Sequence, residues 1–181
     1  LVSIIVTAFR CSQRIKNSIN SLLNQTYKNI EIIVVDDHSD DELGDVVLDL
    51  MKKDDRIKYK RLPRNVGTYA AKTIGLSFAK GEFITCQDSD DWAHPQKIEL
   101  QMQPLLKNKK IVYTTSNLVR VQDDGIFYSK SIYPLMRLNS SSVLFRRSVV
   151  ASETGFWDLV RTGADSEFLA RLRIVFGKKR H

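Results

Sequence analysis

Cysteine is scarce in this sequence, and the two that occur, Cys11 and Cys86, show neither a metal-ligand spacing nor a disulfide framework. Disulfide-rich secreted domains are therefore disfavoured, and we expect a reducing compartment, by default the cytoplasm. No apolar stretch approaches the roughly 20 residues that span a bilayer, and the N-terminus lacks the pattern of a signal peptide. We expect a soluble domain without a transmembrane segment, with peripheral association at the inner face of the membrane as an alternative.

Glycine-rich phosphate loops are also absent. No G-x-G-x-x-G follows Thr7, and no G-x-x-x-x-G-K-[ST] occurs anywhere in the sequence. Dinucleotide-dependent dehydrogenases and P-loop enzymes are therefore disfavoured. If this protein binds a diphosphate, another group has to neutralise its charge.

Length and charge set the remaining limits. With 181 residues and 43% hydrophobic content, the chain can bury one core, so we expect a single domain over 1–181. Leu1 is not an initiator Met, so we expect an excised or processed piece, and the basic run 178–181 just after an apparent helix suggests a truncated C-terminus. The net charge of +7 admits a nucleic-acid-binding domain, but its scattered placement and the lack of a nucleic-acid motif favour a solvated surface and no nucleic-acid partner.

Apolar runs of strand length alternate with amphipathic helical patterns through position 115. This rhythm predicts an α/β fold with a mostly parallel central sheet and helices on both faces. We expect the run at 111–115 to be one more central strand. The expected strands are 2–7, 30–36, 57–62, 82–87 and 111–115. Helices are expected after Ser12, Asp41 and Gly67, and a fourth helix is expected with Pro95 in its first turn and Leu106 on its apolar face.

The pattern changes beyond position 116. Residues 118–122 and 126–129 flank the turn Asp123-Asp124-Gly125 and predict a small antiparallel hairpin at the sheet edge. The serines at 140–142 lead into the apolar residues 143–145. Gly163 precedes a final amphipathic helix.

Polar and aromatic residues gather where the first two strands end. Thr7 and Phe9 lie at the end of the first strand and Asp37 at the end of the second, so all three are expected at the carboxyl edge where α/β sheets bind ligands. Phe9 can stack on a planar base while Asp37 accepts a hydrogen bond from a base N–H, which suits uracil. The alternative is that Phe9 packs within a loop and Asp37 or Ser39 caps the next helix.

An acidic cluster follows another buried strand. Asp88, Asp90 and Asp91 place three carboxylates within four positions, and such like charges repel unless a cation or a polar ligand is bound. Mg²⁺ and Mn²⁺ prefer oxygen ligands and are commonly held by one or two carboxylates plus substrate phosphates. We therefore predict Asp90 as the metal ligand. A solvated turn that leads into the next helix is the alternative, and it can account for Asp91 alone.

A third acidic site opens the last helix, where Asp165 and Glu167 follow Gly163. An Asp at this place is commonly a helix cap. If the chain folds back over the strand ends after the hairpin, Asp165 is instead a candidate general base.

Taken together, these motifs resemble those of family 2 glycosyltransferases with the GT-A fold. Their order and spacing match over nearly the whole chain. The resemblance rests on Val2-Ser3-Ile4-Ile5-Val6-Thr7, Gln25-Thr26-Tyr27, Glu31 to Ser39, Asn65-Val66-Gly67, Gly81-Glu82-Phe83-Ile84, Asp88-Ser89-Asp90-Asp91 and Gly163-Ala164-Asp165.

The resemblance implies an inverting, metal-dependent enzyme that transfers a sugar from a nucleotide diphosphosugar, with UDP as the expected nucleotide, to a saccharide or lipid-linked acceptor hydroxyl. It further implies a role in surface polysaccharide or glycoconjugate synthesis. By the same resemblance the donor-binding residues are Thr7, Phe9, Asp37, Lys72, Asp88 and Ser89, the Mn²⁺ or Mg²⁺ ligand is Asp90, and the catalytic residue is Asp165.

The sequence departs from the family pattern at two positions. Lys72 stands where many members carry Arg, and a lysine lacks the planar fork of a guanidinium. Ala164 replaces the Glu of the family's Glu-Asp pair, for which Glu167 is a partial substitute. The alternatives are a non-catalytic nucleotide-sugar-binding domain and a sugar nucleotidyltransferase, whose glycine-rich loop is missing after Thr7.

Overall fold

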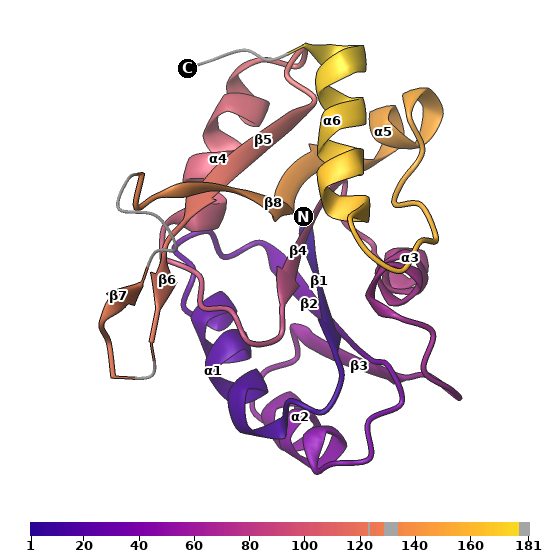
Figure 1. Ribbon diagram of the computed structural model, residues 1–181. Helices are drawn as coiled ribbons and strands as arrows, with labels where there is room; N and C mark the ends of the chain where they lie inside the picture. Colours follow the sequence, from indigo (N-terminus) through magenta and orange to yellow (C-terminus); the bar gives the residue numbers. More distant parts are fainter. Residues whose placement is uncertain (123, 129–133, 178–181) are drawn as a thin grey trace.

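The computed structural model describes residues 1–122, 124–128 and 134–177 (Figure 1). A six-stranded central sheet has the order β3-β2-β1-β4-β8-β5. Its first four members pair in parallel, whereas β8 is antiparallel to both of its neighbours. The strands are β1 (Val2–Ala8), β2 (Ile30–Asp36), β3 (Ile57–Arg61), β4 (Phe83–Asp88), β5 (Tyr113–Leu118) and β8 (Arg137–Arg146).

Helices cover both faces of this sheet. One apolar cluster joins the sheet to α1, α2 and α4, and a second joins it to α3, α5 and α6. The expected α/β class with a mostly parallel sheet is therefore confirmed. The helices are α1 (Ser12–Leu23), α2 (Leu43–Met51), α3 (Thr68–Phe78), α4 (Lys97–Lys107), α5 (Arg147–Glu153) and α6 (Ala164–Phe176).

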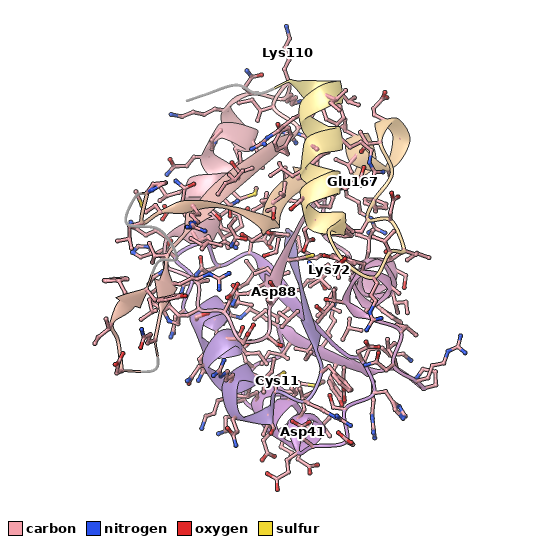
Figure 2. The ribbon with its side chains drawn as sticks, viewed as in Figure 1. Cys11, Asp41, Lys72, Asp88, Lys110 and Glu167 are labelled. Atoms are coloured by element: carbon pink, nitrogen blue, oxygen red, sulfur yellow. The ribbon has the colours of Figure 1, made fainter. Side chains whose placement is uncertain are left out.

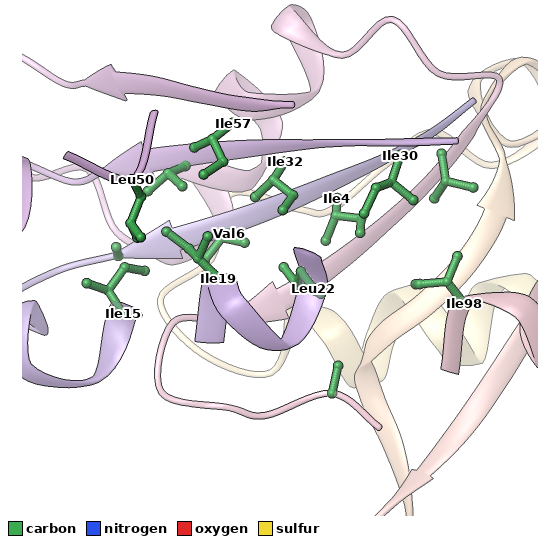
Figure 3. Packing of buried hydrophobic residues seen from close by; sticks show 14 of the residues in the cluster. Ile4, Val6, Ile15, Ile19, Leu22, Ile30, Ile32, Leu50, Ile57 and Ile98 are labelled. Carbon is green, nitrogen blue, oxygen red and sulfur yellow. The ribbon is translucent and has the colours of Figure 1, made fainter. Parts of the chain in front are cut away.

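The sequence of β1 and β2 explains why they lie at the centre. All seven residues of each strand are buried, as expected for parallel strands covered on both faces. Their register pairs Ile4 with Ile32 and Val6 with Val34, and Ile19 and Leu22 of α1 pack against this surface (Figure 3). Each such buried aliphatic side chain contributes about 1.5–3 kcal/mol. The strand ends are thereby held on a rigid support.

An aromatic cluster fixes α6 to the other face. The ring of Phe168 lies 5.4 Å from that of Phe145 in β8 and 5.1 Å from that of Trp157. Phe168 meets Phe145 edge-on and Trp157 at a tilt, and both arrangements favour attraction between aromatic rings. These two contacts dock the start of α6 against the sheet. This docking sets the position of Asp165.

Two predictions about the second half of the sheet are wrong. The strand expected at 111–115 as a central strand begins at Tyr113 and forms the sheet edge, because β8 inserts between it and β4. The serines at 140–142 are part of β8 itself rather than a lead into it. Pro95 also precedes α4 by two residues instead of lying in its first turn.

The small hairpin exists, but its predicted place is wrong. Among the described residues, its strands β6 (Arg120–Val121) and β7 (Phe127–Tyr128) form a two-stranded sheet of their own, separate from the central sheet (Figure 1). Leu118, expected in the hairpin, belongs to β5. Asp123 and Ser129, which were included in the prediction, lie outside the described residues.

Within the part of the chain that the structure describes, no helix combines the length and apolar character needed to cross a bilayer.

Gly75 is a packing constraint of this fold. A Cβ atom there would lie 2.7 Å from Ile5 Cγ2 and 2.9 Å from Val35 Cγ2, so α3 sits directly on β1 and β2. We expect Gly75→Ala to lower the free energy of unfolding by about 1–3 kcal/mol in urea denaturation, because overpacking outweighs the better helix propensity. Gly44→Ala should cost less, since its Cβ meets only the hydroxyl end of Tyr59 at 3.0 Å. Unchanged or higher stability of the Gly75 variant would contradict this packing.

Candidate active site

The carboxyl ends of three parallel strands meet at one edge of the sheet. The register places Thr7 of β1 beside Asp88 of β4, and Ala8 beside Asp36 of β2. Asp36 is buried and accepts hydrogen bonds from Ser39 N at 2.7 Å and Tyr59 Oη at 2.5 Å. The edge is therefore held in place by a carboxylate that accepts a hydrogen bond on each of its oxygens.

A buried lysine faces this edge from α3. Lys72 is 1% exposed, and its Nζ lies 2.8 Å and 2.9 Å from the two carboxylate oxygens of Asp165 at the start of α6. The same Nζ lies 3.9 Å from Asp88 Oδ1 (Figure 2). The rings of Tyr69 and Trp157 flank it at 5.5 Å and 5.8 Å. The structure thus brings Lys72, Asp88 and Asp165 into one charged cluster, as the sequence predicts for residues of one site.

Burial and charge act against each other within this cluster. Burial alone lowers the pKa of Lys72, but the neighbouring acidic groups, Cys86, Asp165 and Asp88, outweigh it and raise that pKa above its ordinary value. Burial also raises the pKa of Asp165, and its attraction to Lys72 offsets only part of this effect. Asp165 is therefore a stronger base than an exposed carboxylate.

Asp37 organises the loop that leads to Lys72. Its buried carboxylate accepts hydrogen bonds from Val66 N at 2.7 Å and Gly67 N at 2.8 Å. Gly67 adopts φ +86°, which favours glycine, and α3 starts at the next residue. Asp37 does not cap the next helix, which was the alternative interpretation. Instead, it ties the end of β2 to the start of α3. Free lone pairs remain on its oxygens for a base N–H.

Thr7 supports the same helix start. Its Oγ1 lies 2.9 Å from Thr68 Oγ1 at the first residue of α3. Thr7 is buried, so its hydroxyl is engaged with the protein.

Phe9 and its neighbours form the exposed side of the site. Phe9 is 43% exposed, and the guanidinium of Arg10 covers one ring face at 5.0 Å while it binds Asp40 through two 2.7 Å hydrogen bonds. Arg10 at φ +50° and His38 at φ +67° both occupy the left-handed region, which is uncommon for residues other than glycine and concentrates at functional sites.

Ser89 and Asp90 lie on the same side as Phe9. Together they line a hollow of about 630 Å³ that also includes Cys11, whose Sγ donates to Ser89 Oγ at 3.2 Å. Thr7, Asp37 and Lys72 do not line this hollow. The predicted donor-binding residues are therefore arranged as two adjoining groups along one sheet edge.

The three carboxylates after β4 differ in their surroundings. The side chain of Asp88 is 43% exposed and faces Lys72. Asp90 is exposed and makes no hydrogen bond or ion pair within the described part of the chain. The pKa of Asp91 is raised to about 6, mainly because the surrounding protein limits the solvation of its carboxylate and to a lesser extent because Asp88 and Asp90 carry the same charge. Asp91 is also exposed, and its side chain makes no hydrogen bond or ion pair among the described residues, so both Asp90 and Asp91 are open to a ligand.

The protein alone does not assemble a full metal cage. Among the described residues, no group of three or more His, Cys, Asp or Glu side chains is arranged to hold a metal ion. One or two carboxylates with substrate phosphates suffice for Mg²⁺ or Mn²⁺, so the open oxygen donors of Asp90 fit such an ion when a diphosphate completes the coordination.

Lys97 is a charged residue at this site that the sequence reading missed. It opens α4, and its Nζ is buried without a hydrogen-bond partner in the described structure. Burial lowers its pKa to about 8, opposed by attraction to Cys86, Asp91 and Asp88. The sequence could have drawn attention to Lys97, because a positive charge at the first residue of a helix is unfavourable with the helix dipole and therefore unusual.

The start of α6 shows where Ala164, which replaces the Glu of the family pattern, and its suggested substitute Glu167 lie. Ala164 is fully buried, whereas the carboxylate of Glu167 is bound to Arg171 at 2.5 Å and 2.9 Å (Figure 2). Arg171 in turn donates to the carbonyls of Thr154 and Phe156. Glu167 is therefore engaged in holding the segment before α6.

Comparisons with known proteins agree with this architecture. The chain is 37% identical over 132 residues to the UDP-Glc:alpha-D-GlcNAc-diphosphoundecaprenol beta-1,3-glucosyltransferase WfaP of Escherichia coli, an alignment that covers 71% of this chain and 51% of that protein. The chain spans about half the length of the curated relatives that it matches first.

Solved structures show the same fold. One is Staphylococcus aureus TarS 1-349 in complex with UDP-GlcNAc, with a TM-score of 0.72 and 21% identity over 94% of this chain and 52% of that one. Another is the mannosyltransferase PcManGT of Pyrobaculum calidifontis in complex with GDP-Man and Mn²⁺, with a TM-score of 0.74 and 16% identity over 96% and 52%. The fold is that of GT-A glycosyltransferases.

Residues 3–168 match glycosyl transferase family 2, which covers nearly the whole chain. The chain belongs to this family, and the predicted resemblance is confirmed.

The ion pair of Lys72 and Asp165 should be a major determinant of stability. We expect Lys72→Met to lower the free energy of unfolding by about 3–5 kcal/mol at neutral pH, because it leaves the half-buried Asp165 carboxylate unpaired. The cost should shrink as the pH falls, since the raised pKa of Asp165 lets it take up a proton and lose its charge. Urea denaturation at several pH values measures both effects, and the double variant Lys72→Met/Asp165→Asn should recover part of the loss. A cost that does not change with pH would show that charge is not its cause.

Proposed function

We propose that this chain is an inverting glycosyltransferase that depends on a divalent cation and transfers a sugar from a UDP-linked donor to an acceptor hydroxyl. The observation that carries this proposal is the placement of a partly buried carboxylate, Asp165, and a buried ammonium, Lys72, at the strand edge that also presents Asp88 and Asp90. A base and a diphosphate site are thereby provided side by side.

Asp165 is the proposed general base. Its side chain is 15% exposed, and its pKa is raised by burial, so it can take a proton from an attacking hydroxyl more readily than an ordinary carboxylate. Lys72 keeps it ionised before the substrate binds and orients both of its oxygens. Attack from the side of Asp165, opposite the departing diphosphate, would invert the anomeric carbon.

The donor is proposed to lie along the edge formed by β1, β2 and β4. Phe9 offers one exposed ring face to the base, Asp37 offers its remaining lone pairs, and Asp88 and Ser89 lie toward the ribose. Lys72 lies near the donor phosphates or sugar. A divalent cation, when bound through Asp90, would neutralise the charge of the diphosphate. UDP is favoured because the relative WfaP is named for UDP-Glc.

The acceptor is proposed to be a saccharide or a lipid-linked sugar in surface polysaccharide or glycoconjugate synthesis. WfaP is named for a diphosphoundecaprenol-linked acceptor. An enzyme that uses such an acceptor would work in the cytoplasm at the membrane surface. A non-catalytic nucleotide-sugar-binding domain is the alternative, and it would bind UDP-sugars without turning them over.

Asp165→Asn tests the base. We expect UDP release from UDP-glucose or UDP-N-acetylglucosamine, by transfer to water or to an added acceptor, to fall about 100-fold or more, because a general base contributes that much to the rate. UDP affinity measured by calorimetry should stay within about twofold of the wild type. Glu167→Gln, which changes a carboxylate in the same helical turn, is the matched control and should keep its activity. Wild-type turnover in Asp165→Asn would refute the assignment.

Asp90→Ala tests the metal ligand. In the wild type we expect Mn²⁺ to strengthen UDP binding and to raise the melting temperature measured with UDP, through linkage of ligand binding to folding. The variant should lose this Mn²⁺-dependent gain and keep the metal-free affinity. Asp91→Asn removes a neighbouring charge and should retain most of the gain. An undiminished response in Asp90→Ala would exclude Asp90 as the ligand.

A further inference from the structure

A second hollow, distinct from the one beside Phe9, runs along the outer face of α1. Its volume is about 470 Å³, within the range of small-molecule sites. Its lining residues come from α1 and the residue after it, from the loop after β4 between Asp90 and Pro95, and from Val121 of the β6–β7 hairpin. Figure 1 shows the hairpin and α1 on the same side of the molecule. We call this hollow the α1 groove.

Three asparagines line the α1 groove at helical spacing. Asn17, Asn20 and Asn24 share one face of α1 and its C-terminal end, and none of their side-chain amides makes a hydrogen bond within the described residues. Asn24 caps the helix, which is a common place for this residue. Asn17 and Asn20 lie inside the helix, where asparagine is unfavourable relative to alanine, so their presence has no explanation in local stability.

An exposed tryptophan forms the wall opposite these amides. Trp92 is 66% exposed, although tryptophan is usually well buried, and the ring of His94 lies edge-on to it at 6.3 Å. The indole N–H makes no hydrogen bond among the described residues. An open ring face with a free N–H suits a ligand that has both an apolar surface and hydroxyls.

The charges of the α1 groove limit the ligand further. Its charged lining residues are Arg14, Asp90 and Asp91, so without a bound cation its carboxylates outnumber its cations and disfavour a polyanion. The uncharged lining also contains three amides, which an apolar helix would leave unpaired. Each amide can donate to one hydroxyl and accept from its neighbour, which matches vicinal hydroxyls.

We propose that the α1 groove binds a neutral oligosaccharide, with Trp92 against the C–H face of a pyranose and Asn17 and Asn20 bonded to its hydroxyls. Asp90 lines both this groove and the hollow beside Phe9, so the α1 groove adjoins that hollow. Its role as the subsite for the body of an acceptor glycan rests on the proposed function, whereas saccharide binding itself does not.

Saturation-transfer NMR with cellotetraose and tetraacetyl-chitotetraose tests the groove. We expect the wild-type chain to bind at least one of these probes, and Trp92→Ala and Asn17→Ala/Asn20→Ala each to weaken binding about tenfold or more, because each removes one element of recognition. Binding should also shield Trp92 fluorescence from acrylamide, while the buried Trp157 stays unaffected.

Matched controls separate the groove from the rest of the protein. Asn29→Ala and Phe78→Ala remove an exposed amide and an exposed ring outside the lining, and they should leave binding unchanged. UDP affinity with Mn²⁺, measured on the same samples, should be retained in the groove variants, so failure of the donor site is seen independently. Absence of binding to both probes, or binding that survives both groove variants, would overturn the proposal.

Discussion

The arrangement of the site depends on one constraint, which is that a lysine ammonium is buried beneath the strand edge and must be paired. Lys72 is 1% exposed, and the desolvation of its charge is compensated by two contacts to Asp165 and a longer one to Asp88. Because Asp165 belongs to α6 and Asp88 to β4, the ammonium links three elements far apart in the sequence. The proposed base therefore owes its position to an electrostatic requirement as well as to the packing of Phe168.

The residues predicted to contact the nucleotide also build the support for Lys72. The carboxylate of Asp37 binds two backbone amides of the loop before α3, and Thr7 contacts the hydroxyl of Thr68 at the first residue of that helix. A change at either position would move α3 and so disturb the ion pair. Variants of Thr7 or Asp37 are therefore expected to lose donor binding through displacement of α3 as well as through any lost contact with the nucleobase.

The sequence predicts the parallel half of the fold well and the antiparallel half poorly, for a physical reason. Both faces of β2 are buried, so the run Ile30–Asp36 is almost wholly apolar and its limits are read correctly. In contrast, β8 begins with exposed and polar residues, and only Val143, Leu144 and Phe145 carry the signal of a core strand. Its insertion beside β4 is a long-range pairing that no local pattern encodes. Lys72, Asp88 and Asp165 were each predicted as site residues in separate roles, but the pairing of Lys72 with Asp165 and the burial of Lys97 depend on contacts across 93 positions and on packing.

The acidic strand end is best understood together with the two lysines around it. Asp88 faces Lys72, Asp91 has a pKa raised to about 6 by limited solvation and like charges, and the buried ammonium of Lys97 attracts Asp91 and Asp88 from α4. The repulsion among the carboxylates is thus partly compensated from within the protein, while the side chains of Asp90 and Asp91 have no hydrogen-bonded or ion-paired partner in the described residues. A cation that binds at this edge would meet these open carboxylates, and the remaining coordination must come from its ligand. This dependence links metal affinity to the presence of a diphosphate, because the protein offers too few donors to retain the ion alone.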